Sequence, residues 1–173
     1  MRYPFVVAAS FVAAAVATPV SAHVTLEVGQ AVAGSYYKAT FRVPHGCAGA
    51  ATTALRIKIP DGVSDVKPQP KPGWKMDVVK TKLDQPMKSG EHGGTVLDRV
   101  SEVSFSGNKL ADDNYDEFAI FVVLPAAPGT TIYFPVVQEC ETGATRWIEI
   151  PANGKTSADY REPAPGLKLI PKP

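Results

Sequence analysis

Apolar and polar residues alternate along much of the chain with the two-residue period that is typical of β-strands. In residues 55–59, Leu55, Ile57 and Ile59 point one way and the cations Arg56 and Lys58 point the other. Turn residues recur at short intervals, and the segments between them are rich in Val, Ile, Phe, Tyr and Thr. The pattern predicts strands over residues 24–28, 36–43, 54–59, 63–67, 74–83, 95–106, 118–124, 131–137 and 145–150.

The periodicity of an amphipathic helix is not sustained anywhere after residue 22. Many short strands without crossover helices predict an all-β protein, an antiparallel β-sandwich of the immunoglobulin-like kind. Its two cysteines are farther apart in sequence than those of true immunoglobulin domains, so the prediction concerns the architecture and not that family. We expect one domain over residues 23–151.

The last 22 residues have a different composition. Pro163, Pro165, Pro171 and Pro173 fall among several charged residues, and few side chains there could fill a core. This composition predicts a Pro-rich extended tail over residues 152–173.

The first 22 residues have the features of a signal peptide. Arg2 provides a short positive region, an apolar stretch covers residues 3–17, and Pro19 breaks the helix before the small residues of Val20-Ser21-Ala22. We expect cleavage after Ala22, which would place the mature protein in the periplasm or another extracytoplasmic compartment, without a membrane anchor.

Charge gives little support for a polyanionic partner. Cleavage would remove Arg2 and leave 17 basic and 17 acidic residues, so the mature chain is close to neutral. Nucleic acids and anionic membranes are bound mostly through positive charge. We therefore expect neither as the main partner.

Cys47 and Cys140 are the two cysteines of the sequence. In an oxidising compartment two such thiols usually pair, and closing so long a loop stabilises a fold by about 4–5 kcal/mol in the chain-entropy model. A thiolate metal site is the alternative, but the sequence has no CxxC spacing. A structural disulfide is the better interpretation.

Cleavage after Ala22 would make His23 the N-terminal residue. Its α-amine and imidazole Nδ1 could then close a six-membered chelate on a metal ion. The amine has a pKa of about 7.7–8.0 and loses its proton readily when a metal competes for it. Two nitrogens with a carboxylate or water in a tetragonal arrangement suit Cu(II).

Carboxylates for such a site are present in an acidic cluster, Asp112, Asp113, Asp116 and Glu117, just before the predicted strand 118–124. A carboxylate at the end of a strand is well placed to complete a metal site at one end of a sandwich. A solvated loop is the common alternative for such a run of charges.

Several ordered motifs resemble those of the YcnI-like family of extracytoplasmic copper-binding proteins. They are Ala22-His23-Val24-Thr25, Arg42-Val43-Pro44-His45-Gly46-Cys47, Ile59-Pro60-Asp61-Gly62-Val63, Pro72-Gly73-Trp74, Asp116-Glu117-Phe118, Phe134-Pro135-Val136-Val137-Gln138, Cys140 and Trp147. The resemblance covers the chain from residue 23 to about residue 151, and it implies a β-sandwich.

The same resemblance implies a monohistidine brace, a Cu(II) site in which one N-terminal histidine gives both its amine and its imidazole. His23 would be that residue, Glu117 would give a carboxylate, and Trp147 would pack beside the metal without necessarily binding it. His45 matches a family position, which we interpret as structural. The partner would be a copper ion and, beyond it, another exported or membrane copper-handling protein.

Three functions are consistent with these features. The favoured one is a non-enzymatic copper chaperone or homeostasis factor. The second is a metal-independent interaction module, and the third is a copper-dependent oxidative enzyme, for which His45 or His92 would have to supply a second histidine. The sequence contains no GxSxG or HExxH motif, so hydrolytic chemistry has no support.

Overall fold

The computed structural model describes residues 23–88 and 94–173, so the predicted signal peptide lies outside the described residues. The described chain is all-β, as predicted, and its helical structure is one short 3-10 turn. The elements are β1 (Thr25–Leu26), β2 (Gln30–Val32), β3 (Tyr36–Val43), β4 (Thr52–Lys58), β5 (Ser64–Pro68), β6 (Lys75–Lys88), β7 (Thr95–Leu110), β8 (Asp116–Val123), β9 (Thr131–Tyr133), β10 (Val136–Cys140), β11 (Ala144–Trp147), η1 (Ser157–Asp159) and β12 (Gly166–Ile170). None of the helical structure in these residues is long and apolar enough to cross a membrane.

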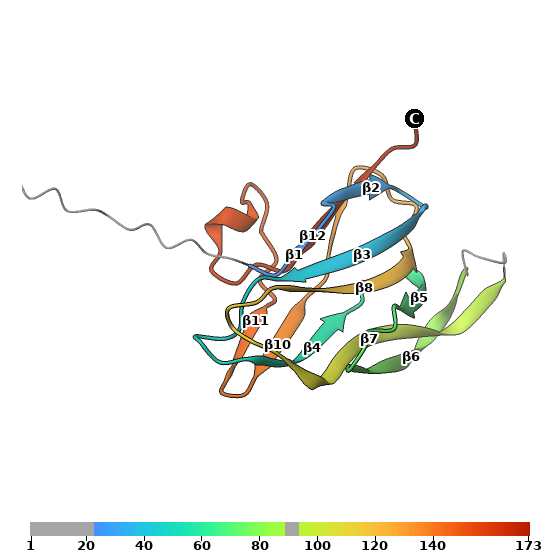
Figure 1. The fold of residues 1–173 in the computed structure, drawn as a ribbon. Helices are drawn as coiled ribbons and strands as arrows, with labels where there is room; N and C mark the ends of the chain where they lie inside the picture. The colour runs from blue at the N-terminus through green and yellow to red at the C-terminus, as the bar shows by residue number, and fades with distance from the viewer. Residues whose placement is uncertain (1–22, 89–93) are drawn as a thin grey trace, which may run out of the picture.

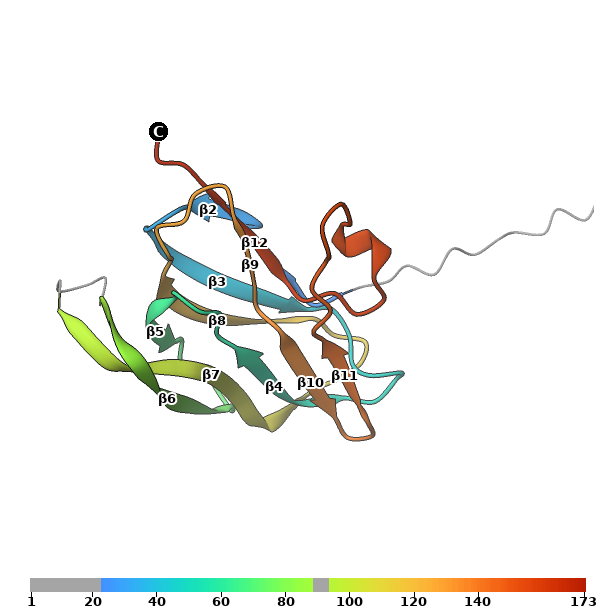
Figure 2. The same cartoon turned by 180° about the vertical axis from the view of Figure 1, so that it is seen from behind.

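Two antiparallel sheets form the sandwich. One has the strand order β1-β3-β8-β5 and the other has the order β11-β10-β4-β7-β6. The two sheets lie one above the other in both Figure 1 and Figure 2. This arrangement confirms the predicted antiparallel β-sandwich.

Aromatic side chains from both sheets meet in the core. The Phe118 ring of β8 lies 5.2 Å from the Phe105 ring of β7 and 4.9 Å from the Trp74 ring, measured between centroids. Phe41 of β3 contacts Phe134, which lies two residues before the start of β10, with 5.6 Å between the ring centroids. Edge-to-face pairs at such separations are favourable and add to the stabilisation from the buried apolar area.

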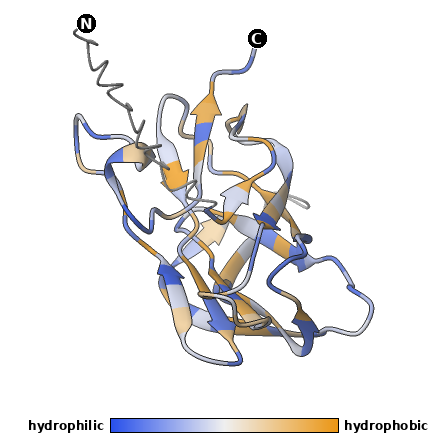
Figure 3. Cartoon of the chain, turned by 60° about the vertical axis from the view of Figure 1, so that its left-hand side comes forward, coloured by the Kyte–Doolittle hydropathy of each residue, from blue (hydrophilic) through white to orange (hydrophobic). Residues whose placement is uncertain are grey.

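Residues 152–173 are not simply a Pro-rich extended tail, and the structure corrects this prediction. β12 lies between β2, with which it is parallel, and β9, with which it is antiparallel. Leu167 and Leu169 are fully buried, while Lys168 between them is exposed. Figure 3 shows hydrophobic and hydrophilic residues alternating along the strand that leads to the C-terminus. The prolines flank the strand, where they cost it no ladder hydrogen bond.

Most predicted strands are present, with shifted ends. The predicted strand 131–137 is two strands, because the chain changes its pairing partner between them: β9 pairs with β12, and β10 pairs with β4. The predicted strand 95–106 extends to Leu110 and carries a bulge around Ser101, where its register with β6 shifts. β2 and β12 were not predicted as strands.

Candidate functional site

His23 is held at one end of the sandwich by its neighbours in the chain. Val24 is 1% exposed and belongs to the core, and Thr25 begins β1 by pairing with Arg42 of β3. His23 itself is half-buried. The burial of Val24 and the start of β1 therefore position the His23 backbone close to the sheet edge.

The His23 ring contacts the C-terminal segment. Its Nε2 lies 3.1 Å from the backbone oxygen of Arg161. A carbonyl oxygen can only accept, so Nε2 carries the proton of this hydrogen bond. In the neutral ring Nδ1 is then the nitrogen with the lone pair, and it is also the ring nitrogen closest to the residue's own backbone nitrogen.

Trp147 on β11 packs against the His23 ring. The two ring centroids are 5.4 Å apart and the planes meet at 76°, an edge-to-face contact. Trp147 is 5% exposed. His23 near the start of the described chain, Arg161 in the C-terminal segment and Trp147 on β11 thus meet at one end of the sandwich.

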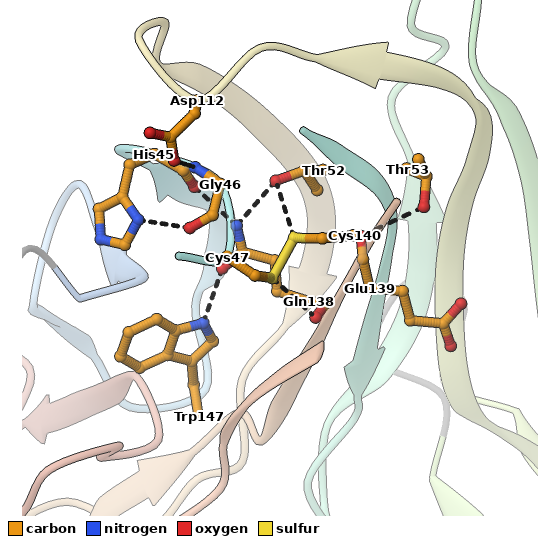
Figure 4. Close-up of a disulfide and its surroundings, with 10 residues drawn as sticks. All are labelled: His45, Gly46, Cys47, Thr52, Thr53, Asp112, Gln138, Glu139, Cys140 and Trp147. Carbon is orange, nitrogen blue, oxygen red and sulfur yellow. Dashed lines mark hydrogen bonds between the residues drawn. A yellow bond between two sulfur atoms is a disulfide. The ribbon is translucent and has the colours of Figure 1, made fainter. Parts of the chain in front are cut away.

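A buried glutamine orients the indole. Trp147 Nε1 donates to Gln138 Oε1 at 3.0 Å, and Gln138 Nε2 donates to His45 O at 2.7 Å and to Thr52 Oγ1 at 2.8 Å. Figure 4 shows the Gln138 side chain between these partners. Gln138 is 1% exposed, so its three hydrogen bonds satisfy an amide that has no access to bulk water.

The predicted disulfide between Cys47 and Cys140 is present, with the Cα atoms 5.9 Å apart. Cys140 ends β10, and Cys47 forms an isolated bridge with Ala50. A side chain at Gly46 would place its Cβ 1.9 Å from Ala50 O, so only glycine fits. The disulfide therefore ties the turn that carries the His45 carbonyl to β10, which holds Gln138 (Figure 4).

Glu117 lies on the four-stranded sheet, two strands away from β1. Arg42 on the intervening strand β3 is in register with both Thr25 and Glu117. Arg42 Nε donates to Glu117 Oε1 at 3.2 Å, and Arg42 Nη2 donates to Glu27 Oε1 at 3.2 Å. Arg42 thus links Glu117 on β8 to Glu27, the residue that follows β1.

Two other acidic residues of the predicted cluster, Asp112 and Asp116, have separate partners. Asp112 Oδ1 accepts from Gly46 N at 2.9 Å, and Asp116 Oδ1 accepts from Lys71 Nζ at 2.7 Å. Across residues 23–88 and 94–173, there is no group of three or more His, Cys, Asp and Glu side chains that could hold a metal ion. A monohistidine brace needs only two such side chains, because the N-terminal amine supplies the third ligand. It therefore contains fewer side chains than the groups of three or more that are absent from the described residues.

The structure thus brings His23 and Trp147 into contact, and it places Glu117 elsewhere on the neighbouring strands. Sequence reasoning missed two members of the site, the Arg161 carbonyl and Gln138. Gln138 could have been noticed as an amide on the same face of a strand as the apolar Val136 and Cys140. A backbone carbonyl has no signal in the sequence.

Comparisons with known proteins agree with this fold. The family model described as "Domain of unknown function (DUF1775)" matches residues 23–169. A crystal structure of an uncharacterized protein from Nocardia farcinica, described as having an immunoglobulin-like fold, superposes with a TM-score of 0.65 at 25% identity, covering 86% of this chain and 98% of that one. The chain matches none of the curated protein sequences with which it was compared.

The family match includes β12, since it extends to residue 169. It also begins at His23, the residue whose ring contacts Trp147. This protein therefore belongs to the DUF1775 family, the domain of YcnI-like proteins, and has its immunoglobulin-like β-sandwich.

Proposed function

We propose that this protein is exported, is cleaved after Ala22, and then holds one Cu(II) through the α-amine and imidazole Nδ1 of His23. Its role is that of a copper chaperone or homeostasis factor without catalytic turnover. The observation that carries the proposal is the hydrogen bond from His23 Nε2 to Arg161 O. It selects the ring tautomer whose Nδ1 has the lone pair that the chelate requires.

The surroundings of His23 suit such a chelate. The Arg161 carbonyl accepts a hydrogen bond from Nε2–H and so orients the ring, as backbone carbonyls do for many metal-bound histidines. Trp147 covers one side of the His23 ring and is itself held by Gln138. A ring held on two sides loses little rotamer freedom when it binds a metal, which favours affinity.

Glu117 is the carboxylate that the family resemblance implies. To reach a metal it would have to leave Arg42, with which it forms an ion pair in which both side chains are more than a third exposed. Exposed pairs contribute about 0–1 kcal/mol, so opening this one costs little. Glu117 is accordingly a weaker contributor to the proposal than His23.

A metal-independent interaction module is the second candidate. Tyr36 and Phe121 stack with their centroids 5.4 Å apart, and they are 53% and 39% exposed. Exposed aromatic pairs are common at protein interfaces. This pair lies on the four-stranded sheet, on β3 and β8, and gives the second candidate its specific support.

Electron paramagnetic resonance of the mature protein with Cu(II) tests the first proposal. We expect one equivalent of bound Cu(II) with nitrogen hyperfine structure. Glu117→Gln should weaken binding, whereas Glu139→Gln should not, although Glu139 is equally exposed and is also paired with an arginine. Binding without nitrogen hyperfine structure, or no binding, would leave the interaction module as the better account.

A further inference from the structure

A pocket of about 300 Å³ opens on the outer side of the four-stranded sheet. Thr40 of β3 and Ala119 of β8 lie opposite one another in the ladder and form its floor. The segment from Gln69 to Pro72, which follows β5, forms one wall. The volume of this pocket is at the lower end of the range of small-molecule sites.

The floor of this pocket contains an unsatisfied hydroxyl. Thr40 is 2% exposed, and its Oγ1 is the buried side-chain polar atom that lacks a hydrogen-bond partner within the described residues. Buried hydroxyl groups are nearly always paired, because an unpaired one carries its full desolvation penalty. Thr40 lines the cavity, and its hydroxyl has no partner among the described residues, so it is suited to bind a ligand.

The charges around the pocket indicate what that ligand is. The two acidic residues of the lining are both engaged, Asp116 by Lys71 and Glu117 by Arg42. Lys38, two residues before Thr40 on the same side of β3, is exposed and makes no ion pair with any described residue. Two donors, one of them cationic, therefore have no acceptor among the described residues.

We propose that this pocket binds a small organic carboxylate, which accepts a hydrogen bond from Thr40 Oγ1 and pairs with the Lys38 ammonium group. The stacked rings of Tyr36 and Phe121 lie beside it on the same side of the sheet, since Phe121 is in register with Lys38. They offer an apolar surface for the rest of the ligand. The proposed ligand contacts neither His23 nor a metal, and its test uses metal-free protein, in which Glu117 of the pocket lining stays paired with Arg42.

NMR chemical-shift titrations of the mature protein with succinate test this proposal. A chelator keeps the protein free of metal during the titration. We expect saturable shifts confined to the backbone amides around Thr40, Ala119 and residues 69–72. Succinamide, which has the same size without the charge, should bind at least tenfold more weakly. Equal binding of the two compounds, or no saturable shift with succinate, would overturn the proposal.

Two variants distinguish a ligand-binding hydroxyl from a structural one. Thr40→Val keeps the shape and removes the unpaired hydroxyl, so we expect an unchanged or higher unfolding midpoint together with at least a tenfold loss of succinate affinity. Lys38→Met should lower the affinity similarly, whereas Lys168→Met on the distant strand β12 should not. A lower midpoint in Thr40→Val with unchanged affinity would show that the hydroxyl is satisfied by water and has a structural role only.

Discussion

The Gln138 amide is the polar group whose removal should destabilise the fold most. Gln138→Leu removes the acceptor of Trp147 Nε1 and the donor to His45 O and Thr52 Oγ1. Trp147 and Thr52 are themselves 5% and 0% exposed, so neither recovers a hydrogen bond from bulk water. Leucine has a similar volume, so the change tests the hydrogen bonds more than the packing.

The cost can be worked from these contacts. Each orphaned buried partner costs about 1–3 kcal/mol, and the added apolar burial of leucine returns about 1–2 kcal/mol. We therefore expect the free energy of unfolding to fall by about 3–5 kcal/mol. With a typical urea dependence for a domain of this size, the midpoint moves down by about 2 M.

Urea unfolding followed by tryptophan fluorescence measures this change. Gln30→Leu is the matched control, because Gln30 is exposed on β2 and its replacement should alter the free energy by less than about 0.5 kcal/mol. If Gln138→Leu lowered the free energy of unfolding by less than about 1 kcal/mol, the hydrogen bonds of the Gln138 side chain would not be what stabilises this end of the sandwich.

Three further predictions concern other parts of the molecule. Leu169→Ala should cost about 2–5 kcal/mol and Lys168→Ala almost nothing in the same urea assay; equal effects would contradict the packing of β12. Replacing both Cys47 and Cys140 by alanine should cost about 4–5 kcal/mol by calorimetry, and an unchanged unfolding transition would contradict this loop-closure account. Burial and, to a lesser extent, the charge of Glu27 raise the pKa of Tyr37 to about 12. Its stabilising contribution is complete below about pH 10 and is lost as the pH rises to about 12, so Tyr37→Phe should lack that loss, and an equal loss in both proteins would refute it.

Much of the fold could be predicted from the sequence, because alternation is local. Tyr36–Val43 has the same bounds as β3, and its buried and exposed residues follow the predicted period over most of its length. The pattern does not predict β12, because only two alternating apolar residues, Leu167 and Leu169, lie there between prolines. Its partners β2 and β9 come from distant parts of the sequence, and only the folded chain shows that they meet it.

The candidate site could be predicted only in part. His23 was identified from its place after the predicted cleavage point, and Trp147 from the family resemblance. The hydrogen bonds to Arg161 O and Gln138 Oε1 depend on the path of the C-terminal segment and on the packing of β10 against β11. Side-chain chemistry alone does not encode such contacts, so the sequence could not have indicated them.

Copper affinity of two otherwise identical proteins tests the central claim most directly. One begins at His23, and the other retains Ala22 in front of it, which converts the α-amine into an amide. Competition titration with Cu(II) should give one tight site in the first protein and at least a hundredfold weaker binding in the second. Equal affinities in the two proteins would contradict the proposal that the His23 amine and imidazole hold the metal together.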